Sequence, residues 1–233
     1  MHEIGYGAFY LFIKKIARLV FPKYTTIQVY PKDRPVVYVS HHQNMLGPIN
    51  ILLWFPKFVR VWSLSVFTDQ ETCYEHYINY TFTKRFKFPL YIAKPLAWII
   101  SYFVSALTHS ACVVPVYRNS RRIIKTLKNS VQALQAGDSI LIFPDIEYTS
   151  NENEVGDIYE GFLNIDKYYY RETGEHIDFI PIYANQDIKE ILYGTPIRFD
   201  SEIPFIDQRE EKAKELQESL NSLASITKQV DLV

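Results

Sequence analysis

The chain of 233 residues carries 25 lysines and arginines against 26 aspartates and glutamates, which gives a formal net charge of -1. This length favours one or two domains, and 48% hydrophobic residues with only 8 glycines exclude a disordered, collagen-like or low-complexity chain. Two cysteines, Cys73 and Cys112, are too few for a disulfide scaffold of this size.

The near-neutral total conceals two oppositely charged halves. Residues 1–130 hold 17 basic and 5 acidic residues, a net charge of +12, and residues 131–233 hold 8 and 21, a net charge of -13. A basic half of this kind fits an anionic membrane surface, a phosphorylated ligand or nucleic acid. The sequence has no zinc-finger spacing and no RNP-like or helix-turn-helix signature, so we expect no nucleic-acid partner.

The first predicted element is a helix with two different faces. Its apolar residues recur at helical spacing: Phe9, Phe12, Ile13, Ile16, Leu19 and Val20. Its basic residues share the other face: Lys14, Lys15 and Arg18. This pattern is typical of a helix that lies in a membrane interface, and also of an ordinary surface helix packed on a core. The charge order is the reverse of that in a secretory signal, so we expect residues 1–24 to be retained as an interface helix before an α/β domain over 25–233.

Predicted strands and helices alternate along the rest of the chain. Strands are predicted at 36–39, 59–64, 111–117, 139–143, 177–183 and 191–199. Helices are predicted over 48–55 with proline at the first position, over 68–85 with a capping box at Thr68-Asp-Gln-Glu71, from 123 to Gly137, up to Gly174, and from Asp207 onward. The alternation predicts the α/β class, with a mostly parallel mixed sheet flanked by helices.

A second apolar segment covers residues 89–107 and has Lys94 as its one charged residue. Its length approaches the roughly 20 residues of a membrane-spanning helix. The Lys94-Pro95 pair interrupts it and leaves only about 12 apolar residues in a row, too few for a span. A segment that dips into the membrane or lies on it is favoured over a span, and a buried core helix is an equal alternative.

The strongest candidate for a chemical site is the polar run from Ser40 to Pro48, which lies between a predicted buried strand and a helix. In open α/β sheets ligands bind at this carboxyl edge of the strands. A second polar cluster, residues 143–150, follows another predicted strand, and the two loops share one crevice if their strands are neighbours. The sequence has no Walker A, GxSxG or HExxH motif, which argues against nucleotide hydrolases, α/β-hydrolases and zincins, and we expect no metal site.

Four blocks of the sequence resemble those of the glycerolipid acyltransferase family that includes the 1-acylglycerol-3-phosphate acyltransferases. The blocks are His42-Gln-Asn-Met-Leu-Gly-Pro48, Val113-Val-Pro-Val-Tyr-Arg118, Phe143-Pro144-Asp145 and Phe179-Ile-Pro-Ile182. Their order and spacing agree with the family over roughly residues 35–200. The resemblance implies transfer of a fatty acyl group to a glycerolipid hydroxyl in phospholipid synthesis. The expected acceptor is like lysophosphatidic acid, the donor is acyl-CoA or acyl carrier protein, and no other cofactor is needed.

In this family a histidine acts as general base and an aspartate five positions later orients its ring. His42 matches the histidine, and we expect it to be the base. Gly47 occupies the position of the aspartate; it can cap the following helix but supplies no carboxylate. Our hypothesis is that Asp145 or Glu147 supplies the carboxylate from the neighbouring strand end.

The third block also departs from the family, because it has one extra residue and lacks the arginine that is linked there to the acceptor phosphate. We expect a group of arginines to bind this phosphate instead: Arg118, Arg121 and Arg122. Further expected substrate contacts are Asn44, Gly47, Tyr148 and Thr149.

These departures leave three functions open: a phospholipid acyltransferase, an acyltransferase for a non-phosphorylated acceptor, and a degenerate member that binds lipid or membrane without turnover. The expected partners are an anionic phospholipid membrane, a lysophospholipid-like acceptor and an acyl thioester. The expected location is the cytoplasmic face of the cell membrane, as a peripheral or monotopic protein.

Overall fold

The structure is a computed structural model that describes residues 5–26, 34–118 and 120–227. The chain folds as two compact units. Unit one consists of Met1–Lys15 and Arg60–Thr126, and unit two of Ile16–Val59 and Leu127–Val233. The predicted division into residues 1–24 and 25–233 remains a prediction.

Unit two is built on a sheet whose strands lie in the order β4 (Ser139–Ile142), β1 (Val37–Ser40), β5 (Phe179–Asn185) and β6 (Glu190–Tyr193). Strand β1 runs parallel to both β4 and β5, and β6 returns antiparallel to β5. Every residue of β1 and β5 is buried, as expected for strands with both faces covered. The predicted fold class, a mostly parallel mixed sheet flanked by helices, is confirmed.

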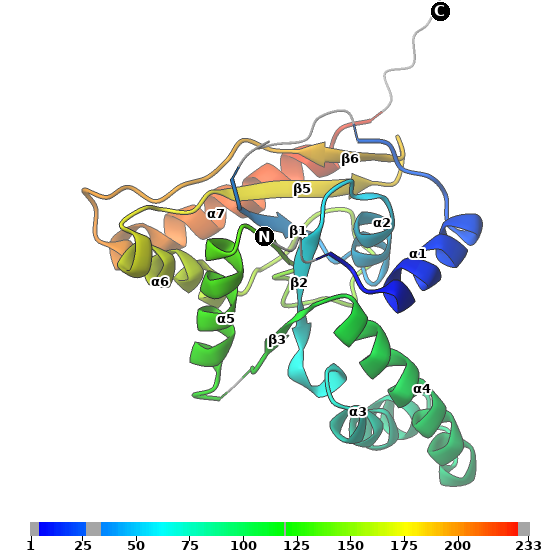
Figure 1. The fold of residues 1–233 in the computed structure, drawn as a ribbon. Coiled ribbons are helices and arrows are strands. Elements are labelled where there is room, and N and C mark those ends of the chain that lie inside the picture. Colours follow the sequence, from blue (N-terminus) through cyan, green and yellow to red (C-terminus); the bar gives the residue numbers. More distant parts are fainter. Residues whose placement is uncertain (1–4, 27–33, 119, 228–233) are drawn as a thin grey trace, which may run out of the picture. The chain divides into compact units, whose positions relative to one another are not determined.

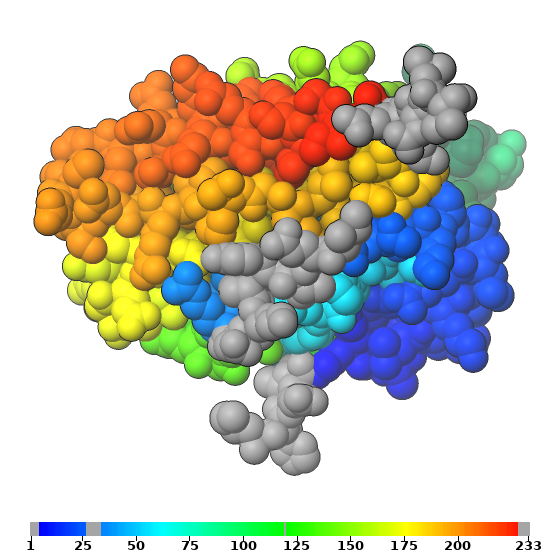
Figure 2. Space-filling model, turned by 90° about the horizontal axis from the view of Figure 1, so that it is seen from above, coloured from blue at the N-terminus to red at the C-terminus, as the bar shows by residue number. Residues whose placement is uncertain are grey.

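Helices surround this sheet in Figure 1. Unit two contains α2 (Leu46–Trp54), the 3-10 turn η3 (Glu160–Leu163), α6 (Asn164–Thr173) and α7 (Phe205–Ala224), and α5 (Ile123–Gln135) enters it from unit one. The end of α7 packs on Tyr183 of β5 through Leu223 and Ala224, and Figure 2 shows α7 in orange and red beside the gold β5–β6 hairpin. Helix α6 stops at Gly174, as predicted, because this glycine adopts a left-handed conformation with φ of 78°.

Unit one contains the parallel strands β2 (Val59–Leu64) and β3 (Val114–Val116) and a helical hairpin. The hairpin runs from η1 (Ser65–Phe67) through α3 (Gln70–His76) and the π-helix η2 (Tyr77–Arg85) into α4 (Leu90–Ser110), and α3 lies alongside α4 (Figure 1). The first turns of α1 (Ala8–Val20) attach to the end of α4, because the Gly7 amide donates to the Ser110 carbonyl at 2.7 Å and the Tyr10 amide to the Ser110 hydroxyl at 2.8 Å.

Two predictions for the helical hairpin are wrong. The helix cap is Asp69 rather than Thr68, because the Asp69 carboxylate accepts from the Thr72 amide at 3.0 Å. The expected interruption at Lys94-Pro95 does not occur. Pro95 is the sixth residue of α4, and its missing N–H leaves one hydrogen bond of the helix unmade, yet the helix runs unbroken from Leu90 to Ser110, 21 residues in all.

Helices α1 and α4 expose large apolar side chains. In α1, Phe12 is 60% exposed and Leu19 is 84% exposed. In α4 the buried residues are three small ones at four-residue spacing, Ala93, Ala97 and Ser101, whereas Trp98 is 56% exposed. The alternative of a buried core helix over 89–107 is therefore wrong. By length and composition, α4 is the one helix among the described residues that could cross a membrane.

Candidate active site

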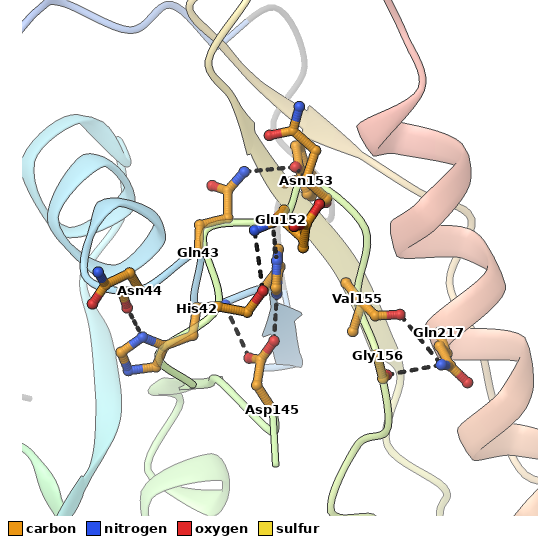
Figure 3. A network of polar contacts seen from close by, with 12 residues as sticks. His42, Gln43, Asn44, Asp145, Glu152, Asn153, Val155, Gly156 and Gln217 are labelled. Carbon is orange, nitrogen blue, oxygen red and sulfur yellow. Dashed lines mark hydrogen bonds and ion pairs between the residues drawn. The ribbon is translucent and has the colours of Figure 1, made fainter. Parts of the chain in front are cut away.

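The candidate site lies at the carboxyl ends of β1 and β4, which are adjacent parallel strands. Val39 of β1 pairs with Ile142 of β4, so the loops that follow the two strands begin side by side. The predicted common crevice is confirmed, because Asp145 from the second loop contacts both His41 and His42 from the first (Figure 3).

The loop after β1 turns back on itself at His42. Gln43 and Asn44 both have positive φ, 44° and 57°, a conformation that asparagine tolerates better than most residues. This turn brings the Asn44 carbonyl oxygen to Nδ1 of His42 (Figure 3). Since a carbonyl oxygen only accepts hydrogen bonds, Nδ1 carries the proton. The His42 ring also lies against the rings of Phe143 and Tyr148, with centroids 5.7 and 5.8 Å away.

Gly47 is required by close packing of the backbone. Helix α2 begins at Leu46 after the N-cap Met45, so the prediction that Gly47 is the N-cap and Pro48 the first helical residue is wrong by two positions. Gly47 donates its amide to the His42 carbonyl at 3.1 Å. A Cβ atom at this position would lie 2.1 Å from the carbonyl oxygen of His41. The position of the family's aspartate is therefore closed to any side chain.

Asp145 is buried and holds two groups of the first loop. One carboxylate oxygen contacts Nδ1 of His41, and the other accepts from the main-chain amide of His42 at 2.9 Å. In Figure 3 the His42 ring points toward Asn44 and away from Asp145. Our hypothesis that Asp145 or Glu147 orients the His42 ring is thus wrong in its geometry, because Asp145 binds the His42 backbone and Glu147 is exposed and accepts from the Thr149 hydroxyl.

The group that orients the His42 ring is instead the main-chain carbonyl of Asn44. It selects one tautomer and one ring orientation, as a carboxylate would. It lacks the negative charge with which an aspartate stabilises the imidazolium form. Sequence reasoning could not find this group, because a main-chain carbonyl is present at every residue.

The His41 side chain joins the loop after β1 to the loop after β4. Its side chain is 3% exposed, Nδ1 contacts Asp145, and Nε2 contacts the main-chain carbonyl of Glu152 at 3.0 Å. Burial favours the neutral ring and would lower the pKa of His41. The hydrogen bond and charge of Asp145, together with the Glu152 carbonyl, outweigh burial and raise this pKa above its ordinary value.

The loop 150–157, which follows the third block, is held in place by contacts on two sides. On one side, the Tyr183 hydroxyl accepts from the side-chain amide of Gln43 at 2.6 Å and donates to the main-chain carbonyl of Asn153 at 2.7 Å. Burial raises the pKa of Tyr183, so this hydroxyl keeps its proton. On the other side, α7 provides Gln217, whose amide donates to the Gly156 carbonyl at 2.8 Å (Figure 3). A cavity of about 530 Å³ lies between His41, Asp145 and this loop.

The remaining predicted substrate residues fall in two places. Asn44 and Gly47 belong to the same loop as His42, and Tyr148 lies against the His42 ring. The side-chain amide of Asn44 donates to Asn151 at 3.2 Å. The three arginines belong to unit one, in the turn after β3, where Arg118 and Arg121 are exposed and the Arg122 guanidinium lies 4.2 Å from the centre of the Tyr117 ring. Within the described residues no group of His, Cys, Asp and Glu side chains is arranged to hold a metal ion.

The chain has an acyltransferase-like α/β fold. A similar solved structure is the crystal structure of the 1-acyl-sn-glycerophosphate acyltransferase PlsC from Thermotoga maritima, with a TM-score of 0.51 and 15% sequence identity over 95% of this chain and 80% of that chain. The acyltransferase-like fold that the resemblance implied is thereby confirmed. No protein-family model matches the chain, and no curated protein is similar to it in sequence.

Proposed function

We propose that the protein is an O-acyltransferase that moves a fatty acyl group from acyl-CoA or acyl carrier protein to the hydroxyl of a glycerolipid like lysophosphatidic acid. The observation that carries this proposal is the placement of His42 at the carboxyl edge of a parallel sheet of acyltransferase fold, with Nδ1 directed at the Asn44 carbonyl. This is the arrangement that a general base requires.

The chemistry asks little of the protein, because a thioester is already activated. With the proton on Nδ1, the lone pair of the neutral His42 ring is on Nε2. Nε2 would take the proton of the acceptor hydroxyl while the hydroxyl oxygen attacks the thioester carbonyl carbon. The new C–O bond then replaces the C–S bond, and the departing thiolate recovers the proton from the imidazolium. No covalent acyl-enzyme intermediate is needed.

The test is an acyl-transfer assay with purified protein. Radiolabelled acyl-CoA or acyl carrier protein is supplied with lysophosphatidic acid, other lysophospholipids or monoacylglycerol, and the lipids are separated. We expect a new acylated phospholipid. Product from monoacylglycerol alone would instead assign a non-phosphorylated acceptor, consistent with the missing third-block arginine.

A second candidate function is lipid binding without turnover. The closed position of Gly47 favours it, because the site then has no carboxylate to stabilise a charged His42 ring. Binding of lysolipid without product from any donor and acceptor pair would select this function over the first.

We further propose that unit one contacts an anionic membrane on the cytoplasmic side of the cell. Its residues, Met1–Lys15 and Arg60–Thr126, include 11 basic and 4 acidic ones, a net charge of +7, whereas unit two has 14 and 22, a net charge of -8. The exposed apolar side chains of α4 follow a basic cluster in η2 and the turn after it: Lys84, Arg85 and Lys87. Apolar surface beside basic residues is what an interface-bound segment needs.

Charge reversal of this basic cluster is expected to weaken membrane binding by at least about 100-fold, since each basic residue near an anionic surface contributes roughly 1 kcal/mol and the new carboxylates are repelled. The measurement is co-sedimentation of the Lys84→Glu/Arg85→Glu/Lys87→Glu variant with phosphatidylserine-containing vesicles at low salt. The control reverses three exposed basic residues of unit two: Lys128, Arg171 and Lys214. Equal loss in both variants, or binding that high salt does not reduce, would contradict this proposal.

A further inference from the structure

We infer that His41 is a positioning residue: as a doubly protonated ring it bridges Asp145 and the Glu152 carbonyl and so fixes the main chain that orients His42. The inference rests on the proposed function in its catalytic consequence, but the protonation of His41 can be measured without any assay of activity.

The first support is that both ring nitrogens of His41 face oxygen atoms that accept hydrogen bonds. Nδ1 contacts the Asp145 carboxylate, and Nε2 lies 3.0 Å from the Glu152 carbonyl oxygen. A neutral imidazole donates from one nitrogen only, so its other lone pair would face an oxygen. The imidazolium form satisfies both contacts.

The second support is that the two charges are buried together. The side chains of His41 and Asp145 are 3% and 4% exposed. A carboxylate buried to this extent needs a partner of opposite charge, and among the described residues His41 is the charged partner in contact with Asp145. Loss of the charge on His41 would therefore leave the Asp145 carboxylate buried without this charged partner.

The third support is the connection from His41 to the His42 ring. Asp145 accepts the His42 amide at 2.9 Å with the oxygen that does not contact His41. That amide begins the turn through Gln43 and Asn44, whose left-handed conformations aim the Asn44 carbonyl at His42 Nδ1. His41 thus acts on the ring of His42 indirectly, through the Asp145 carboxylate and the main chain of residues 42–44.

A tyrosine ring and several carboxylates surround His41. The Tyr183 ring stacks on it, with centroids 6.2 Å apart. Several carboxylates line the same cavity as His41: Asp145, Glu147, Glu152, Glu154 and Asp157. The Asp145 hydrogen bond and negative charge are what raise the pKa of His41 against burial.

A pH dependence follows with a definite sign. Because the pKa of His41 is raised in the folded protein, the stabilisation by this bridge is fully present below the unfolded value of about 6.5 and is lost as pH rises through the folded pKa. We therefore expect the pH profile of kcat to have an alkaline limb: kcat falls as pH rises through the folded pKa of His41, while KM for the acceptor changes little.

The experiment combines kinetics with nitrogen NMR of histidine-labelled protein. His41→Ala should lower kcat roughly 10- to 100-fold, the usual loss when a residue that orients an active-site side chain is removed. His41→Gln, which can still donate to Asp145 but does not titrate, should recover part of this loss and abolish the alkaline limb. The NMR spectrum of the wild-type protein at neutral pH should show both His41 ring nitrogens protonated.

A matched control is His176, a partly buried histidine of unit two that contacts Asp166 at 2.8 Å. It precedes β5, whereas His42 follows the parallel strand β1, so it lies at the opposite edge of the sheet. His176→Ala and His176→Gln should leave kcat and the pH profile unchanged. A single proton on His41, or a kcat loss in His41→Ala no larger than in His176→Ala, would overturn the inference. Absence of acyl transfer from the wild type, with two protons on His41, would reject the proposed function alone.

Discussion

Replacement of His42 by alanine is expected to lower kcat by roughly 100- to 10,000-fold, the usual contribution of a general base. The KM values for donor and acceptor should change little, because the imidazole acts on the hydroxyl proton in the transition state rather than on substrate binding. Steady-state kinetics with the best acceptor found in the acyl-transfer assay measure both quantities. Circular dichroism should show an unchanged fold, since the His42 ring is only partly buried.

The control for this substitution is His109→Ala, which removes an exposed histidine of unit one near the end of α4. We expect its kcat to match the wild type. Equal product from the wild type and His42→Ala would remove His42 from the mechanism and leave the acyltransferase fold without its expected base.

The second large effect is expected at Gly47, where the Gly47→Asp substitution recreates the family motif in sequence. It should destroy activity rather than improve it. The new Cβ would lie 2.1 Å from the His41 carbonyl oxygen and 2.9 Å from that of His42, so the loop must move. Overpacking of this kind costs about 3 kcal/mol, which corresponds to a lower Tm by roughly 6 to 12 °C for a chain of this size.

Two further variants separate backbone packing from charge. Gly47→Ala should be nearly as damaging as Gly47→Asp, because the clash involves Cβ itself. Gly156→Ala is the matched control, since nothing lies within 4 Å of its added Cβ, and its Tm should stay close to that of the wild type. A Gly47→Asp protein with normal Tm and higher kcat would show that the loop adapts to a carboxylate and that our account of this position is wrong.

The sequence predicted the sheet well because buried strands and amphipathic helices have clear periodicities. It also suggested that the loops after β1 and β4 share one crevice if these strands are neighbours, and the parallel pairing of Val39 with Ile142 shows that they are. It failed where one residue decides a local geometry. Asp69 rather than Thr68 caps α3, and α4 continues through Pro95 despite the loss of one hydrogen bond.

The partners within the site were less predictable than its location. Asp145 was expected to contact the ring of His42, yet it contacts the ring of His41 and the amide of His42. Adjacent residues of an extended chain point in opposite directions, so a shift of one residue exchanges the two histidines. Loop spacing in the sequence does not resolve such a shift. The left-handed conformations of Gln43 and Asn44 then turn the His42 ring away from Asp145.

The charge pattern was informative but its boundary was misplaced. The sequence placed the change of sign near residue 130. The folded units divide it differently, since Ile16–Val59 joins the acidic unit two, although it precedes the basic segment Arg60–Thr126 in the chain. The loop with His42 therefore belongs to the acidic unit.

Because a main-chain carbonyl orients His42, mutation and selection act on this site differently than on a site with an orienting side chain. Every amino acid supplies a main-chain carbonyl, so no point mutation deletes this group, and only a change in the course of the loop can withdraw it. Selection would then act on the residues that shape the loop, Gly47 among them, rather than on an orienting side chain. Related proteins could share this device while having different residues at position 44.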